Sequence, residues 1–80
     1  MTELETLGTV TTIVRHAFDN DQINLTMESA GKDIPGWDSF HYVDIILRIQ
    51  EALGVKIRAR EANNVKTIGD LVRLIQVKLA

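Results

Sequence analysis

The sequence predicts an all-α protein: a four-helix bundle of three longer helices and one short helix, with a long loop between the first two. Three observations support this prediction. Apolar residues recur every three or four positions in three segments, which is the period of an amphipathic helix. Capping residues precede two of these segments. The uneven loop lengths argue against a symmetric up-and-down bundle.

Composition limits the class of protein. The 80 residues are expected to form a single domain, residues 1–80, because a chain this short supports only one core. There is no cysteine, which excludes disulfides, cysteine-based zinc sites and thiol catalysis by the protein itself. The net charge of -2 disfavours nucleic-acid binding. No signal peptide or membrane span is visible, so we expect a cytoplasmic protein that binds neither nucleic acid nor membrane.

The first helix is predicted from one apolar stripe. Glu3 and Glu5 lie in its first turn, where carboxylates stabilise the positive end of the helix dipole. The pattern stops before the turn-forming cluster Asp19-Asn20-Asp21. The stripe consists of Leu4, Leu7, Val10, Val14 and Phe18.

Residues 19–38 are predicted to form a long connection. Gly31, Pro35 and Gly36 rule out a continuous helix there. A loop of this length in a compact domain is usually functional or disordered. Its apolar side chains predict that it is pinned across the core: Ile23, Leu25, Ile34 and Trp37.

A second, central helix is predicted from about Ser39 to Leu53. Asp38 is a suitable N-cap and Gly54 a suitable C-terminal residue. Asp44 and Arg48 have the spacing of a helical ion pair. We assign Phe40, Val43, Ile46, Leu47 and Leu53 to its buried side, with Ile45 and Ile49 widening the apolar surface.

The C-terminal part predicts a short helical turn and a last helix. The turn is placed near Ala59 to Asn63. Thr67 and Asp70 have the spacing of a capping box at the start of the last helix. Its apolar stripe consists of Ile68, Leu71, Val72, Ile75 and Leu79.

Ser39 is the residue whose position points to chemistry. A serine in the first turn of a helix presents its hydroxyl to the solvent, and a phosphate attached there would meet free N–H groups and the positive helix dipole. A hydrolase nucleophile is not expected. His41 lies on another face of the helix, His16 lies late in the first helix, and no Gly-x-Ser-x-Gly elbow is present. From local chemistry alone, a plain solvated serine remains the alternative.

Four stretches together resemble the acyl carrier protein family over about the whole chain. The family's Asp-Ser-Leu motif is matched by Asp38-Ser39-Phe40, and the following pattern by His41-Tyr42-Val43-Asp44. The apolar residues, glutamate and glycine that come later are matched within residues 45–55. The opening of the family's last helix is matched by Thr67-Ile68-Gly69-Asp70. The resemblance implies a small cytoplasmic four-helix bundle.

The resemblance also implies a mechanism. A phosphopantetheinyl transferase would move a 4′-phosphopantetheine arm from coenzyme A onto Ser39, with Asp38 beside the attachment point. The thiol of the arm would hold an acyl group as a thioester, and the missing cysteines fit this because no protein thiol competes. The protein would not be an enzyme. It would act as a monomer that presents its cargo to acyl-loading and acyl-modifying enzymes, and it would need no metal.

The charges depart from those of the family's fatty-acid members. Residues 55–66 have a net charge of +3, whereas that region is usually acidic in those proteins. We therefore expect a specialised stand-alone member with different partners, because electrostatic complementarity sets specificity and encounter rate. The candidate partner-binding residues are Trp37, Phe40, His41, Asp44, Arg48, Arg58 and Arg60.

Some of these assignments have competing interpretations. Trp37 could be only a loop anchor, Phe40 a core residue, and the two histidines and Arg58 and Arg60 simply solvated. The cargo is open between fatty-acid, polyketide and aminoacyl or peptidyl groups. Apolar cargo could be lined by Ile46, Ile49, Val65 and Ile75. A non-covalent helical interaction module is the alternative from a different functional class.

Overall fold

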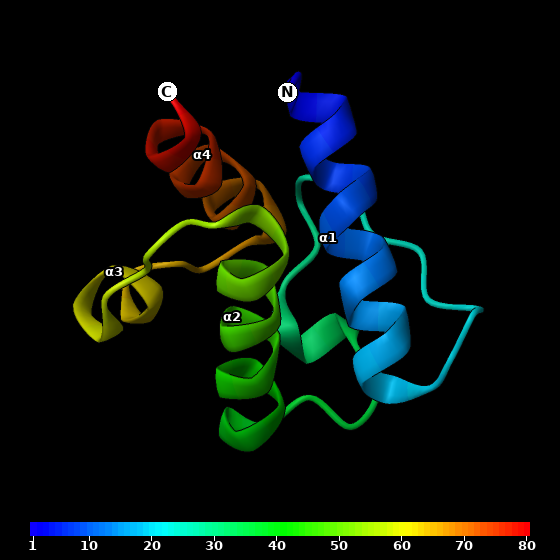
Figure 1. Ribbon diagram of the computed structural model, residues 1–80. Coiled ribbons are helices and arrows are strands. Elements are labelled where there is room, and N and C mark those ends of the chain that lie inside the picture. Colours follow the sequence, from blue (N-terminus) through cyan, green and yellow to red (C-terminus); the bar gives the residue numbers. More distant parts are fainter.

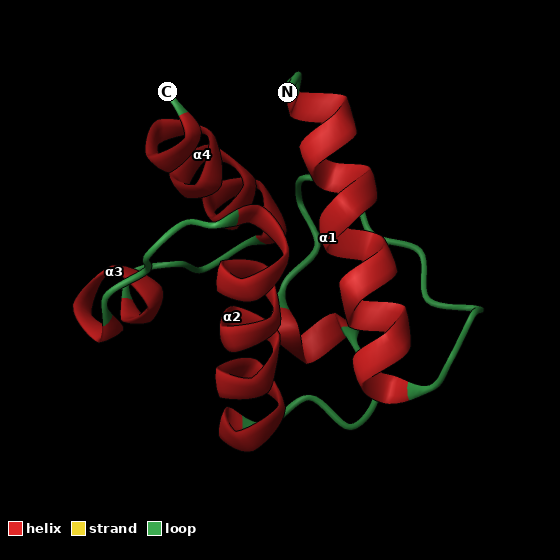
Figure 2. Cartoon of the chain, in the orientation of Figure 1, coloured by secondary structure: helices red, strands yellow, loops and turns green.

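A computed structural model describes all 80 residues as helices joined by loops, without a β-strand (Figures 1 and 2). The predicted all-α bundle with one short helix and a long first loop is confirmed. A 3-10 turn within that loop, η1, was not predicted. No helix has the length and apolar character needed to cross a membrane. The elements are α1 (Glu3–Phe18), η1 (Gly31–Asp33), α2 (Ser39–Leu53), α3 (Ala59–Asn63) and α4 (Ile68–Leu79).

The helix ends are set by side-chain caps and by one glycine. The Asp38 carboxylate accepts a hydrogen bond from the His41 N–H at 2.9 Å, which fixes the start of α2. The Thr67 hydroxyl accepts from the Asp70 N–H at 3.1 Å, so the predicted capping box of α4 is confirmed. Gly54 ends α2 with a positive φ of 66°, a conformation that favours glycine.

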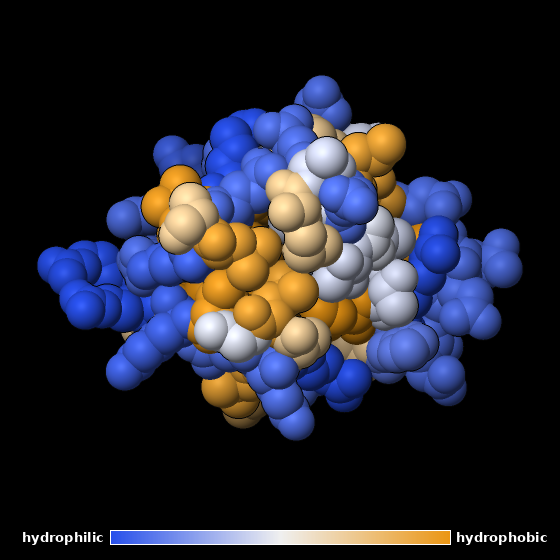
Figure 3. Space-filling view, turned by 45° about the horizontal axis from the view of Figure 1, so that its top comes forward, coloured by the Kyte–Doolittle hydropathy of each residue, from blue (hydrophilic) through white to orange (hydrophobic).

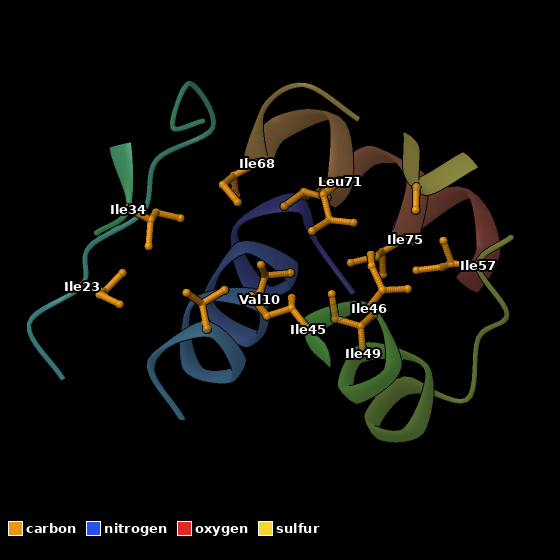
Figure 4. Close-up of a cluster of buried hydrophobic side chains, with 13 residues drawn as sticks. Val10, Ile23, Ile34, Ile45, Ile46, Ile49, Ile57, Ile68, Leu71 and Ile75 are labelled. Carbon is orange, nitrogen blue, oxygen red and sulfur yellow. The ribbon is translucent and has the colours of Figure 1, made fainter. Parts of the chain in front are cut away.

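The core lies where α1 packs against both α2 and α4 (Figures 1 and 4). Short α3 stands apart on the other side of α2 (Figure 1). The core is almost wholly aliphatic, and isoleucine is its commonest residue. Its members are Val10, Val14, Ile23, Ile34, Ile45, Ile46, Ile49, Ile57, Ala62, Ile68, Leu71, Val72 and Ile75.

The buried face of α2 differs from the prediction. Phe40, Val43 and Leu47 were assigned to the core, but their exposed fractions are 85%, 56% and 56%. Ile45 and Ile49, assigned to the margin, are fully buried against α1 and α4. The helix carries apolar residues around most of its circumference, so periodicity alone could not decide which side faces the core. The stripes of α1 and α4 are likewise shorter than predicted, because Leu4 and Leu79 are exposed.

The long loop is pinned to the bundle, as predicted. Ile23 and Ile34 are buried in the core, and Leu25 and Trp37 pack against it. Arg15 of α1 also holds the loop, because its Nε donates to the Ile23 carbonyl at 2.7 Å.

Backbone hydrogen bonds join the same loop to the start of α4. The Ile68 N–H donates to the Ser29 carbonyl at 2.7 Å, and the Gly69 N–H donates to the Met27 carbonyl at 2.8 Å. These bonds satisfy N–H groups that a helix start otherwise leaves without partners. A Cβ atom on residue 69 would lie 2.6 Å from the Met27 carbonyl oxygen, so only glycine allows this approach. The loop that leads to Ser39 is thereby fixed both to α1, through Arg15, and to the start of α4.

Candidate functional site

Ser39 is the first residue of α2, and it is exposed. The first backbone hydrogen bond of the helix runs from the Tyr42 N–H to the Asp38 carbonyl at 3.0 Å. The backbone N–H groups of Ser39 and Phe40 come before that bond, so they donate to no carbonyl within the helix. An anionic group on the Ser39 oxygen would therefore stand next to polar N–H groups and the positive end of a 15-residue helix.

Asp38 is held in place by His41. One carboxylate oxygen of Asp38 accepts both the His41 N–H at 2.9 Å and a hydrogen bond with the ring Nδ1 at 2.8 Å. These hydrogen bonds, the backbone one first, lower the pKa of Asp38 below its ordinary value. The carboxylate thus stays charged at neutral pH and fixes the residue that precedes the serine.

Aromatic rings from three parts of the chain support this turn. His41 stacks on Phe18 at the end of α1, with ring centroids 4.5 Å apart. The Trp37 ring also lies beside Phe18, with centroids 6.2 Å apart, and its centroid is 5.5 Å from that of the Tyr42 ring. The Tyr42 hydroxyl donates to the Ala62 carbonyl of α3 at 2.7 Å. This row of rings, which we call the aromatic row (His41, Phe18, Trp37 and Tyr42), ties α1, the loop and α3 to the start of α2.

Two glycines allow the loop to approach the aromatic row closely. A Cβ atom on Gly31 would lie 2.4 Å from the Trp37 indole nitrogen, which is far inside van der Waals contact. Gly36 has a positive φ of 83°, and a Cβ there would contact the Phe18 ring at 3.5 Å. The direction of the chain into Asp38 and Ser39 therefore depends on glycine at both positions.

Beside Ser39, the exposed side of α2 faces α3 across an apolar cavity of about 220 Å³. We call this the α2–α3 groove. On the α2 side, its most exposed members are Val43 and Leu47. The α3 side is formed by smaller residues, and the full lining is Tyr42, Val43, Ile46, Leu47, Gln50, Ile57, Ala59, Ala62 and Asn63.

The structure brings together only part of the predicted site. Ser39, Asp38, Phe40 and His41 lie in one turn, and the predicted Asp44–Arg48 ion pair is confirmed at 3.0 Å. Trp37 is half-buried and anchors the loop. Arg58 and Arg60 are exposed at the start of α3.

Two predictions about individual residues need correction. His41 is not a plain solvated side chain, because it is hydrogen-bonded and stacked. Of the residues expected to line a cargo site, only Ile46 lines the α2–α3 groove. Ile49 and Ile75 are fully buried in the core, and Val65 lines two other cavities.

Two residues that shape the site were not recognised in the sequence. Phe18 was assigned only to the core stripe of α1, and Tyr42 received no role. A signal was present, because three of the chain's four aromatic residues fall within residues 37–42. Such clustering around a candidate serine marks a packed turn.

Comparisons with known proteins agree with this geometry. Residues 36–75 match the family model described as "Phosphopantetheine attachment site". The curated "Acyl carrier protein 2" of Ralstonia nicotianae is 32% identical over 80 residues, covering 100% of this chain and 99% of that protein. The curated "Acyl carrier protein" of Exiguobacterium sibiricum is 25% identical over 79 residues, covering 99% and 100%.

Solved structures show the same architecture. The solution structure of a holo acyl carrier protein from Geobacter metallireducens has a TM-score of 0.87 and 36% identity, covering 92% of this chain and 85% of that one. The crystal structure of an acyl carrier protein from Thermotoga maritima has a TM-score of 0.84, covering 96% and 89%; at 18% identity it supports the fold alone.

Fold and site together define a helical carrier whose prosthetic group is 4′-phosphopantetheine. The chain belongs to the acyl carrier protein family, which confirms the resemblance seen in its motifs. Membership implies interaction with a phosphopantetheinyl transferase and with acyl-handling enzymes.

Proposed function

We propose that Ser39 carries the 4′-phosphopantetheine arm, and that the chain presents acyl thioesters on it to enzymes of fatty-acid, polyketide or related specialised biosynthesis. One observation supports Ser39 above all. It is the only serine within the matched residues 36–75, and it stands exposed at the first position of α2.

The residues around Ser39 fit a phosphodiester. A transferase would take the proton of the Ser39 hydroxyl while its oxygen bonds to the pantetheine-linked phosphorus of coenzyme A and 3′,5′-ADP leaves. The N–H groups of the first turn of α2 would face the resulting negative charge. Asp38 holds the turn in shape through its hydrogen bonds with His41. The arm supplies the only thiol, because the chain has none.

The α2–α3 groove fits part of an apolar acyl chain. It opens one turn beyond Ser39 on the same helix, at Val43, and most of its lining residues are apolar. A thioester held on a flexible arm could fold back into this space, which would remove apolar carbons from water at roughly 25 cal/mol per Å².

We further propose that the chain acts as a monomeric, single-domain and non-catalytic carrier in the cytoplasm. The partner enzymes would contact the residues around Ser39, among them the exposed Phe40 and Arg48 and the partly buried His41 and Asp44. Specialised partners are supported by the net charge of +3 over residues 55–66.

Intact mass spectrometry tests the attachment. After incubation with coenzyme A and a broad-specificity phosphopantetheinyl transferase, the protein should gain the mass of one phosphopantetheinyl group. Ser39→Ala should gain nothing. The matched control is Ser29→Ala, which removes the only other serine and should still be modified.

Two results would contradict the proposal. One is no mass gain in the wild-type chain under conditions that modify a known carrier. The other is modification of the Ser39→Ala variant. Loading the modified protein with acyl and aminoacyl donors would then separate an acyl carrier from a peptidyl or aminoacyl one.

A further inference from the structure

The segment that forms one wall of the α2–α3 groove carries uncompensated positive charge. Residues 55–66 hold four cations and one carboxylate, Glu61. The charge of Glu61 is already paired, because the ammonium group of Lys78 in α4 donates to its carboxylate at 2.7 Å. None of the four cations, Lys56, Arg58, Arg60 and Lys66, forms an ion pair with a carboxylate.

The facing residues 38–54 offset only part of this charge, because Asp38, Asp44 and Glu51 against Arg48 give them a net charge of -2. Asp44 is paired with Arg48 at 3.0 Å, whereas the hydrogen bonds with His41 hold Asp38 in its charged form. The remaining carboxylate of α2, Glu51, lies in the last turn, far along the helix from Ser39. The groove is therefore bordered by positive charge on its α3 side, although the whole chain has a net charge of -2.

The middle of this surface is apolar. Phe40, Val43 and Leu47 follow one another at three and four residues along α2 and are all more than half exposed. Helical spacing places them in one row, which is the arrangement that contacts a partner groove or helix. Figure 3 shows an apolar patch in the middle of the visible face, with strongly hydrophilic surface projecting on the side where Figure 1 places α3.

We infer that the exposed surface around the α2–α3 groove, rather than its cavity, docks a partner protein whose own docking surface is apolar in the middle and carries carboxylates on the side that faces α3. This inference rests on the proposed function and adds the charge of the partner. Complementary charges would steer the encounter and reject partners with basic docking surfaces. A protein partner is favoured over an acidic cargo because Arg58 and Arg60 do not line the cavity itself.

Two synthetic helical peptides test the sign of the charge. Both carry leucines at positions i, i+3, i+4 and i+7; one has glutamates on either side of this row, and the other has lysines. Each is titrated into the phosphopantetheine-modified, isotope-labelled protein, and binding is followed by NMR. The glutamate peptide should bind about tenfold or more tightly than the lysine peptide. It should shift the Val43 and Leu47 methyl signals and bind more weakly as salt rises from about 50 to about 500 mM.

A matched pair of variants localises the effect. Arg60→Glu should weaken binding of the glutamate peptide about three- to tenfold. Lys32→Glu makes the same charge change at an exposed position of η1 and should leave binding unchanged. Thermal melting of both variants separates loss of binding from loss of fold, and Arg60→Gln, which keeps the length of a polar side chain, should weaken binding to a lesser degree.

Several outcomes would overturn the inference. One is equal or tighter binding of the lysine peptide. Others are NMR shifts confined to residues outside the groove, or a loss of binding in Lys32→Glu equal to that in Arg60→Glu. Co-sedimentation with phosphatidylglycerol vesicles and no response to the glutamate peptide would assign the groove to an anionic lipid surface instead. Concentration-dependent shifts without peptide would assign it to a second copy. The proposed function fails separately, by the absence of a mass gain at Ser39.

Discussion

Asp38 acts on the attachment turn through two hydrogen bonds to a single residue. Both bonds to His41 favour the charged carboxylate, so the pKa of Asp38 is lower in the folded protein than in the unfolded chain. A lowered carboxyl pKa contributes stability above the unfolded pKa, near 3.8, and this contribution is lost as the pH falls through the folded pKa. The turn that presents Ser39 should therefore loosen in acid.

The variant Asp38→Asn measures this contribution. At pH 7 it should have a lower Tm than the wild type, because the amide caps α2 without charge. As the pH falls from about 5 to about 2.5, the two Tm values should converge, since the wild-type carboxyl becomes protonated. Melting curves monitored by circular dichroism at stepwise pH give the result. A gap that widens in acid would show that the carboxylate is not stabilised by its hydrogen bonds.

Three further carboxyls should add to the loss of stability at low pH. The pKa of Glu5 is lowered by its hydrogen bonds with Thr2, and that of Asp70 by backbone N–H groups of Lys66 and Thr67. The pKa of Glu61 is lowered first by its hydrogen bond with Lys78. Each of these carboxyls lies at a helix start, so acid should fray helix ends rather than open the aliphatic core.

At the scale of elements, the loop before α2 is shaped by close contact with the aromatic row. Gly31→Ala would place a methyl group against the Trp37 ring and should destabilise the fold by about 1–3 kcal/mol. Gly8→Ala is the matched control. Nothing lies within 4 Å of its Cβ position in α1, so alanine should stabilise the helix by up to about 1 kcal/mol.

Urea unfolding monitored by Trp37 fluorescence compares the two glycine variants, because Trp37 is the only tryptophan. Opposite signs of the change in unfolding free energy are expected. Equal effects would mean that the loop yields to the added methyl group. Slower phosphopantetheinyl transfer to Gly31→Ala would link the loop shape to the presentation of Ser39.

Sequence patterns predicted local features of the elements well. The caps Asp38, Gly54 and Thr67 located three helix ends, because capping depends on residues within one turn. The pairing of Asp44 with Arg48 is local for the same reason. The serine itself was found through its place after the cap.

The features that were not predicted depend on distant contacts. The aromatic row joins residues 18, 37, 41 and 42, and the loop reaches α4 through backbone carbonyls that carry no side-chain signature. The face of α2 was misjudged because apolar residues serve two purposes on this helix. Ile45 and Ile49 fill the core, whereas Val43 and Leu47 line the groove.

For the whole molecule, the buried face and the exposed face of α2 should contribute unequally to the free energy of unfolding. Ile49→Ala should lower the unfolding free energy by about 2–5 kcal/mol, because a fully buried side chain leaves a cavity. Leu47→Ala should cost about 1 kcal/mol or less, because its side chain is largely exposed. Chemical denaturation of both variants measures the difference. Similar costs would mean that α2 is rotated about its axis relative to this structure.

The hydrogen bonds from Ile68 and Gly69 to the Ser29 and Met27 carbonyls have a consequence for biosynthesis. During translation, the loop leading to Ser39 cannot reach its final shape until residues 68 and 69 have left the ribosome. A nascent chain that ends before α4 would expose the same serine without the turn around it. Modifying enzymes that recognise shape would thus act only after α4 has been made and has left the ribosome.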